Sequence, residues 1–278
     1  MRGLRFLALV ALLTACGGTD EPVDAGGAEV DSGVDAGSMA SDAGADAGPA
    51  DTDAGVDAGS DAGPACGPFV ACASDPTVTD DDGNVYATVD ICGQCWMAEN
   101  LRVGIEVTVD PSGPVSAQFQ TDDGTVQTYC PRNRSAGCTE LGGLYQWNEL
   151  MAYGAAPRGI CPAGWHVPSD DEWKTLERAL GMSAAEADRR SDGTPRGTDE
   201  GAQLKTGGRA SFDATLAGFA SEVFGHYDIS TPGSIGRYWT STRSGANAWY
   251  RGLSDASSAV DRSFESGDHG YSARCVRD

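Results

Sequence analysis

Residues 160–180, ICPAGWHVPSDDEWKTLERAL, carry the clearest pattern of polar and apolar positions in the chain. Ser169 and Glu172 have the S-x-x-E spacing of a helix-capping box, so a helix is expected to begin at Asp170. The apolar positions that follow recur every three or four residues: Trp173, Leu176 and Leu180. Gly181 then supplies the left-handed residue that ends many helices. The pattern predicts a helix of about three turns with one apolar face and no catalytic group.

Shorter elements follow this helix. Ser183 and Glu186 repeat the S-x-x-E spacing, which predicts a short helix through about Arg190, and residues 202–205 are expected to form one further turn. Glycine- and serine-rich segments then separate five short apolar stretches: residues 216–220, 237–242, 248–253, 259–264 and 271–277. This spacing predicts an antiparallel meander of strands. Most aromatic residues on these strands are expected in the core, and any exposed ones are candidates for a ligand platform: Trp239, Trp249, Tyr250 and Phe264.

Residues 80–84, DDDGN, separate Val78 from the strand-like stretch 85–89. Glycine and asparagine tolerate positive φ, so this segment predicts a hairpin turn. A calcium loop is the alternative. An EF-hand needs oxygen ligands at alternate positions before its glycine, however, and Val78 occupies the first of them. The turn is therefore the favoured interpretation.

The amino-terminal residues have the pattern of an export signal. Arg2 and Arg5 precede an apolar run, residues 6–13, which is too short to span a bilayer but suits a signal peptide. The run ends in Leu-Thr-Ala-Cys, which resembles the lipobox of bacterial lipoproteins. We therefore predict that residues 1–15 are a signal peptide and that Cys16 is lipidated and anchors the chain to the membrane. An ordinary signal peptide next to a chance cysteine is the alternative.

The segment at residues 16–65 contains Asp-Ala-Gly seven times and twelve acidic residues, with no Lys, Arg or aromatic residue. Small and like-charged residues cannot bury enough apolar surface to offset chain entropy, so we predict a disordered tether. Calcium-binding repeats also contain Asp and Gly, but their apolar repeat position is missing here and the spacing is irregular. The tether is expected to hold the following domain away from the lipid surface.

The net charge of −22 is too large for the tether alone to explain, so the folded part is expected to be acidic as well. An acidic chain without clustered Lys and Arg disfavours nucleic acid and anionic lipid headgroups as partners. After the tether, a short cysteine-bearing lead-in is expected at residues 66–76 and one well-buried domain at residues 77–278. The expected location is the cell envelope, at the outer membrane or the cell surface.

Eight cysteines remain besides Cys16, and an even number in an exported protein predicts disulfides. Sequence alone permits many connectivities. Proximity along the chain favours three local pairs: Cys66 with Cys72, Cys92 with Cys95, and Cys130 with Cys138. The CGQC spacing also matches the redox-active pair of thioredoxin-like enzymes. Those enzymes place the pair at the start of a helix, whereas Cys92 and Cys95 lie in a predicted hairpin region, so a structural disulfide is favoured.

Several motifs occur in the order found in one known family: residues 80–101, 142–151, 161–173 (CPAGWHVPSDDEW), 238–242 (YWTST) and 271–278 (YSARCVRD). Together they resemble the Fibrobacter succinogenes major paralogous domain over about residues 77–278. The resemblance implies an α+β domain of C-type-lectin-like or formylglycine-generating-enzyme-like fold, with short helices, antiparallel strands and stabilising disulfides. It implies no general activity. The family match includes Cys161 and Cys275, and a lectin-like fold would bond these two and so join the helix region to the last strand.

The resemblance leaves three functional hypotheses open. We expect a binding or adhesion module whose extracellular ligand is a glycan or a protein. The first alternative is an oxidase of the formylglycine-generating type, which holds copper by two cysteines close together near its C-terminal end. Beyond Cys161 this chain contains only Cys275, so the residues for that activity are missing. The second alternative is a purely structural envelope protein.

No catalytic residue, metal ligand or cofactor is predicted. Trp147-Asn148-Glu149 is similar to the Trp-Asn-Asp triplet of C-type lectins, but it precedes the main helix and lacks the partner motif, so sugar binding through it is disfavoured. The histidines share no zinc-ligand spacing: His166, His226 and His269. No nucleophile elbow or phosphate loop occurs.

Overall fold

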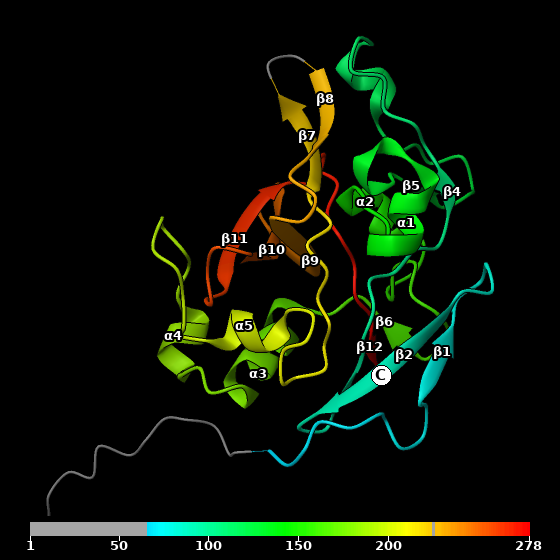
Figure 1. The fold of residues 1–278 in the computed structure, drawn as a ribbon. Coiled ribbons are helices and arrows are strands. Elements are labelled where there is room, and N and C mark those ends of the chain that lie inside the picture. The colour runs from blue at the N-terminus through cyan, green and yellow to red at the C-terminus, as the bar shows by residue number, and fades with distance from the viewer. Residues whose placement is uncertain (1–65, 224–225) are drawn as a thin grey trace, which may run out of the picture. The chain divides into compact units, whose positions relative to one another are not determined.

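The computed structural model describes residues 66–223 and 226–278 (Figure 1). The predicted signal peptide, Cys16 and the predicted tether therefore lie outside the described residues. Within the described part, no helix is both long and apolar enough to cross a bilayer.

A five-stranded antiparallel sheet combines the first three strands of the described chain with the last one. Its strands lie in the order β1-β2-β3-β12-β6: Thr77–Thr79, Val85–Ile91, Gln94–Met97, Val276–Arg277 and Trp165–His166. The predicted turn at residues 80–84 connects β1 and β2. The Asp80 carboxylate accepts hydrogen bonds from the backbone N–H groups of Asp82 and Asn84, at 3.0 and 2.8 Å, and Gly83 has φ +84°. The hairpin prediction is confirmed.

The turn between β2 and β3 explains the disulfide pattern. Cys92 and Gly93 form a two-residue turn with φ of 57° and 87°, the positive values that a type I′ turn requires. The segment before β1 lies against this hairpin, since the Asp90 N–H donates to the Val70 carbonyl at 2.7 Å. The cysteines of the lead-in thus meet those of the hairpin. The observed bonds are Cys66–Cys92 and Cys72–Cys95.

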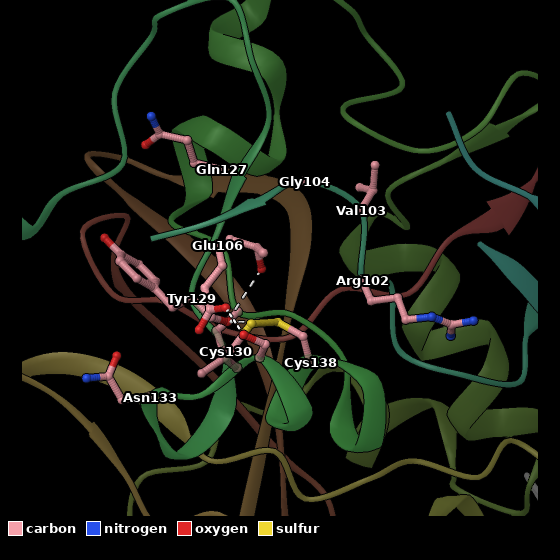
Figure 2. The surroundings of a disulfide bond; sticks show 12 residues. Arg102, Val103, Gly104, Glu106, Gln127, Tyr129, Cys130, Asn133 and Cys138 are labelled. Atoms are coloured by element: carbon pink, nitrogen blue, oxygen red, sulfur yellow. Dashed lines mark hydrogen bonds between the residues drawn. A yellow bond between two sulfur atoms is a disulfide. The ribbon is translucent and has the colours of Figure 1, made fainter. Parts of the chain in front are cut away.

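Two predicted pairings were therefore wrong, namely Cys66 with Cys72 and Cys92 with Cys95, because sequence proximity ignored the pairing of lead-in and hairpin. The other two pairings are confirmed. Cys130 bonds Cys138 across 8 residues of sequence, and Cys161 bonds Cys275 across 114. Figure 2 shows the Cys130–Cys138 bond, near which the Glu106 carboxylate accepts a hydrogen bond from the Ser135 hydroxyl.

A three-stranded sheet forms the predicted meander. Its strands β9 (Ile235–Ser244), β10 (Asn247–Ser254) and β11 (Asp261–Ser266) pair antiparallel in the order β11-β10-β9. β11 starts later than predicted because Val260 pairs with Arg196 instead. The strand predicted at residues 271–277 is shorter than expected, because only Val276–Arg277 form β12. Before it, Tyr271 and Ser272 form isolated bridges with Tyr145 and Tyr238.

Two smaller ladders complete the strands. β7 (Phe219–Val223) and β8 (His226–Ser230) form an antiparallel hairpin. The strand predicted at residues 216–220 corresponds to β7, which begins three residues later, and β8 was not predicted. β4 (Ile105–Glu106) and β5 (Gln127–Thr128) pair in parallel. The structure thus combines short helices and mainly antiparallel strands with four disulfides, as predicted from the sequence.

The main predicted helix is confirmed as α3 (Asp170–Ala179). Its capping box is complete, because the Ser169 hydroxyl accepts from the Glu172 N–H and the Glu172 carboxylate accepts from the Ser169 N–H. The second S-x-x-E marks α4 (Ala184–Asp188), and the predicted single turn is α5 (Glu200–Leu204). Figure 1 shows these three helices grouped beside the β9–β11 sheet.

The remaining short helices were not predicted. They are α1 (Ser135–Leu141), α2 (Trp147–Leu150), and the 3-10 helices η1 (Val115–Gln118), η2 (Pro131–Asn133) and η3 (Ala152–Gly154). None of them has a side-chain cap hydrogen bond. Long-range hydrogen bonds hold the end of α1 instead, since the Asn100 amide and the Thr215 hydroxyl each donate to the Leu141 carbonyl at 2.9 Å. At its start Gly137 packs against the preceding turn, where a Cβ would lie 1.8 Å from the Pro131 carbonyl oxygen.

The core between α3 and the sheets is aromatic. Trp96 packs against Trp173 and Phe212, with ring centroids 5.1 and 5.7 Å apart, and all three side chains are fully buried. A second aromatic group includes Trp239 of β9, whose ring stacks on that of Tyr271 with centroids 4.2 Å apart. Burying such large rings is the main source of stability in a domain of this size.

A buried ion-pair network joins α3 to the three-stranded sheet. Arg262 makes two hydrogen bonds to the Asp170 carboxylate, at 2.9 and 2.7 Å. Arg251 bridges Asp170 and Glu177 at 2.7 and 2.6 Å, and Arg196 binds Glu177 from the other side at 2.7 Å. Burial alone would raise the pKa of Asp170, but the hydrogen bonds and charges of Arg262 and Arg251 hold it well below its usual range.

Candidate functional site

The residues singled out from the sequence mostly serve the fold. Cys92 and Cys95 are each bonded to the lead-in, so they do not form a CGQC disulfide with one another. His166 lies between Glu172 and Asp278, with contacts of 2.8 and 2.6 Å, and His269 contacts the Tyr271 hydroxyl at 3.0 Å. Across residues 66–223 and 226–278, no three His, Cys, Asp or Glu side chains are grouped to hold a metal ion.

The strand aromatics are divided between core and surface. Trp239 is fully buried, whereas Trp249 and Phe264 are half-buried and meet edge-to-face at 5.1 Å. Arg262 covers the Trp249 ring and Arg190 covers the Phe264 ring, at 3.9 and 4.1 Å. Each of these partly exposed rings therefore already has a guanidinium packed on it.

A hollow of about 340 Å³ lies beside residues 98–102, and the polar side chains that line it form hydrogen bonds within the protein. Asn100 donates to the Leu141 carbonyl at 2.9 Å and accepts from Arg274 at 2.8 Å. Glu99 accepts from the Ala87 N–H and pairs with Arg102. Because these groups satisfy one another, this hollow offers little to a ligand.

The strongest candidate is the concave region around the loop at residues 151–160, where three hollows adjoin. The loop leaves α2 and returns to Ile160, whose N–H donates to the Leu150 carbonyl at 2.9 Å. Gly159 has φ +68°, and a Cβ there would lie 2.4 Å from the Leu150 carbonyl oxygen. Only glycine fits that return of the chain.

The first hollow measures about 420 Å³ and is lined by α2, the loop and β9. The Arg243 guanidinium stacks over the Trp147 ring at 4.0 Å and donates to the Asn148 amide oxygen at 3.2 Å. The Trp147 indole N–H donates to the Thr240 carbonyl at 2.8 Å, which fixes the ring. Within the described residues Arg243 forms no ion pair with a carboxylate. Its remaining N–H donors are therefore available to a ligand.

The second hollow measures about 210 Å³ and shares Tyr153 with the first. Glu149 lies on its lining and is only 2 % exposed. Its carboxylate accepts from the Gln127 N–H at 2.9 Å and from the Tyr153 hydroxyl at 3.0 Å. No cation pairs with it in the described part of the chain. Burial therefore raises the pKa of the Glu149 carboxyl, with a contribution from the neighbouring Asp123 and Asp122.

Tyr153 separates these two hollows and is 37 % exposed. Ala152, Tyr153 and Gly154 have successive φ values of 48°, 49° and 82°. Non-glycine residues in this left-handed region cost free energy and persist where the surroundings impose them, commonly at functional sites. The hydrogen bond to Glu149 holds the Tyr153 ring in this position.

A third hollow of about 430 Å³ continues from the second at Thr125, Val126 and Ile160. Asp81 and Asp82 of the β1–β2 turn line its far side. Arg158, also on its lining, donates to the Cys161 carbonyl at 2.5 Å. The concave region thus draws residues from five separate parts of the chain.

Sequence reasoning missed this region almost completely. Tyr153, Asp122 and Arg243 were not singled out, and Trp147-Asn148-Glu149 was considered only as a lectin-type triplet. The structure divides that triplet, because Trp147 and Asn148 line the first hollow and Glu149 the second. The one signal that could have been used is an acidic residue among the aromatic and aliphatic residues of 144–151 (LYQWNELM), since a carboxylate is expensive to bury without a partner.

These features define a disulfide-stabilised domain of mixed helices and antiparallel strands with an open concave region. The family model of the Fibrobacter succinogenes major domain matches residues 89–277, and the chain belongs to this family. Neither the search of curated proteins nor the search of solved structures found a match.

Proposed function

We propose that this protein is a lipid-anchored module of the cell envelope that binds an extracellular glycan or protein. The lipobox at Cys16 and the acidic tether support the anchoring, and the four disulfides fit an oxidising compartment outside the cytoplasm. Replacing Cys16 with serine should release the chain from membrane fractions. Unchanged partition of that variant would rule out the lipid anchor.

The proposed recognition surface is the concave region around residues 151–160. One observation carries this assignment: Tyr153, an exposed ring in a strained backbone conformation, is held between two hollows by a buried carboxylate. Ligand sites typically combine a preformed hollow with a few fixed polar groups. A ring that is already ordered loses little conformational entropy when a ligand packs against it.

We also propose a C-type-lectin-like architecture for the domain. The support is the Cys161–Cys275 bond, which joins the segment before α3 to the last strand, together with the β9–β11 meander. The oxidase alternative would need a reduced cysteine pair to hold copper. All eight cysteines of residues 66–278 are in disulfides. A purely structural role would give no reason to retain a strained loop and an unpaired buried carboxylate.

The binding proposal can be tested with a screen of glycans and cell-wall fractions against the full chain. Tyr153→Ala should weaken binding at least tenfold, because the ring forms the border of both hollows. Val85→Ala is the matched control, since Val85 is also exposed, at 52 %, but lies outside the three hollows. Equal binding by the two variants would remove the concave region from consideration.

A further inference from the structure

The two hollows that meet at Tyr153 carry opposite charge. Among the described residues lining the first hollow, Arg243 alone is charged. Among those lining the second, Glu149 and Asp122 alone are charged. The hollow that contains Arg243 is suited to an anion, and the adjoining hollow that contains Glu149 and Asp122 is suited to a cation. The Tyr153 ring lies between them.

The positive side is prepared for a carboxylate. The guanidinium of Arg243 is fixed by its stacking on Trp147 and by the hydrogen bond to Asn148. A planar guanidinium that is already oriented binds a carboxylate through two parallel hydrogen bonds and loses little side-chain entropy in doing so. In the described part of the chain no carboxylate pairs with this guanidinium, and none lines the first hollow.

The negative side is prepared for an ammonium group. Glu149 contributes a charge at the base of the hollow, and the exposed Asp122 adds a second at its opening. Because Glu149 is almost fully buried, its field is weakly screened by water and favours a cation. The Tyr153 ring beside it adds a face over which a cation is attracted.

We propose that the concave region binds a zwitterionic peptide end, with its carboxylate at Arg243 and its ammonium group between Tyr153, Glu149 and Asp122. This inference rests on the proposed binding function and specifies the ligand. A neutral sugar would leave both charges without partners. A polyanion would be repelled by Asp122, by Glu149 and by the net charge of −22. A peptide that ends in a basic residue supplies both groups with an apolar spacer to cross the ring.

The probe is a series of acetylated tripeptides, Ac-Ala-Ala-X, in which X is diaminopropionate, ornithine or lysine. Each is compared with its C-terminal amide and with its side-chain acetylated form by calorimetric titration of the full chain. We expect at least one free peptide to bind, and each blocked form of it to bind about tenfold more weakly or worse, as for loss of a charge-assisted hydrogen bond.

Variants separate the two charges. Arg243→Gln should abolish the preference for the free carboxylate while keeping the preference for the free amine. Asp122→Asn with Glu149→Gln should do the reverse. The controls are Arg190→Gln, since Arg190 also stacks on a ring, at 4.1 Å from Phe264, and the exposed Asp255→Asn. Both controls should bind as the wild type does.

The outcomes distinguish this inference from the proposed function. If no free peptide binds more tightly than its blocked forms, while a glycan or cell-wall fraction binds in a Tyr153-dependent manner, the zwitterion assignment is wrong and the binding function stands. If Arg190→Gln weakens binding as much as Arg243→Gln does, the assignment is equally wrong. If nothing in either screen depends on Tyr153, both proposals fail.

Discussion

Asp170 and Glu149 are both buried carboxylates, 4 % and 2 % exposed, yet their surroundings differ completely. Asp170 lies within 3.2 Å of three cationic side chains, those of Arg251, Arg262 and Lys174. Among residues 66–223 and 226–278, Glu149 has no cationic partner, and its carboxylate accepts from a backbone N–H and a tyrosine hydroxyl. The pKa of Asp170 is lowered and that of Glu149 is raised.

The difference separates a region stabilised by its charges from one that is destabilised by them. Around α3, the ion pairs, the aromatic core and the Cys161–Cys275 disulfide, which closes the longest loop of the four, all favour the folded state. Around residues 147–160, a buried carboxylate without an ion-pair partner in the described part of the chain and the positive φ values of Ala152 and Tyr153 oppose it. Functional sites commonly retain such costs because optimising them for stability would remove the groups that bind.

The largest expected effect concerns the Cys161–Cys275 disulfide of the α3 region, with the short-range Cys130–Cys138 bond as the reference. Cys161→Ser opens a loop of 114 residues, for which the chain-entropy model gives about 4–5 kcal/mol of lost stability. Cys130→Ser opens a loop of 8 residues and should cost about half as much. Denaturant unfolding of the two variants measures the difference. Equal losses would contradict the larger contribution assigned to the long-range bond.

Removing the charge of Asp170 should be nearly as damaging. Asp170→Asn leaves Arg251 and Arg262 buried without their shared partner, which typically costs about 3–5 kcal/mol. Asp171→Asn is the matched control, because the Asp171 side chain is 89 % exposed and its loss should change stability by less than about 0.5 kcal/mol. Similar melting temperatures for the two variants would contradict the role assigned to the network.

Glu149→Gln should behave in the opposite way. A glutamine can accept from the Gln127 N–H with its carbonyl oxygen and donate its amide N–H to the Tyr153 hydroxyl, so both contacts can persist without the buried charge. The free energy of unfolding of the variant at pH 7 should therefore equal that of the wild type or exceed it by about 1 kcal/mol. Because the pKa of Glu149 is raised, its protonated form favours the fold, and this contribution is lost as pH rises through the folded-state value. The variant's advantage should therefore shrink as pH falls towards the unfolded-state pKa. A variant less stable at pH 7 would mean that the carboxylate is structural.

The smallest expected effect is a pH dependence at the end of β6. The hydrogen bond to Glu172, opposed by burial and supported by Asp278, raises the pKa of His166 to about 8. The contact should stabilise the fold fully below pH 6.5 and be lost as pH rises through 8. We expect about 1 kcal/mol after allowing for solvent screening, measured as the difference between wild type and His166→Gln from pH 6 to 9. A constant difference across that range would count against it.

The sequence predicted the elements whose signals are local. α3 was found because its cap, Ser169 with Glu172, and its apolar stripe lie within a few residues of each other. The β1–β2 hairpin and the β9–β11 meander were found for the same reason. α1 and α2 were missed because Arg134 and Gln146 precede them without any capping side-chain hydrogen bond.

What the sequence could not predict depends on contacts between distant segments. The lead-in disulfides follow from the pairing of Val70 with Asp90, which no local pattern announces. The concave site combines Asp122, Glu149, Tyr153 and Arg243 from different elements. The positive φ of Tyr153 has no signature in residue type, because tyrosine is not a residue that normally adopts it.

The central claim is that ligand binding occurs at the destabilised region and not at the stabilised one. Its most direct test is an amide NMR titration of the full chain with a soluble cell-wall fraction or with a bound peptide from the series above. We predict chemical-shift changes at residues 147–160 and at Arg243, with none along α3. Changes concentrated on α3 or on the three-stranded sheet, with residues 147–160 unaffected, would contradict the account.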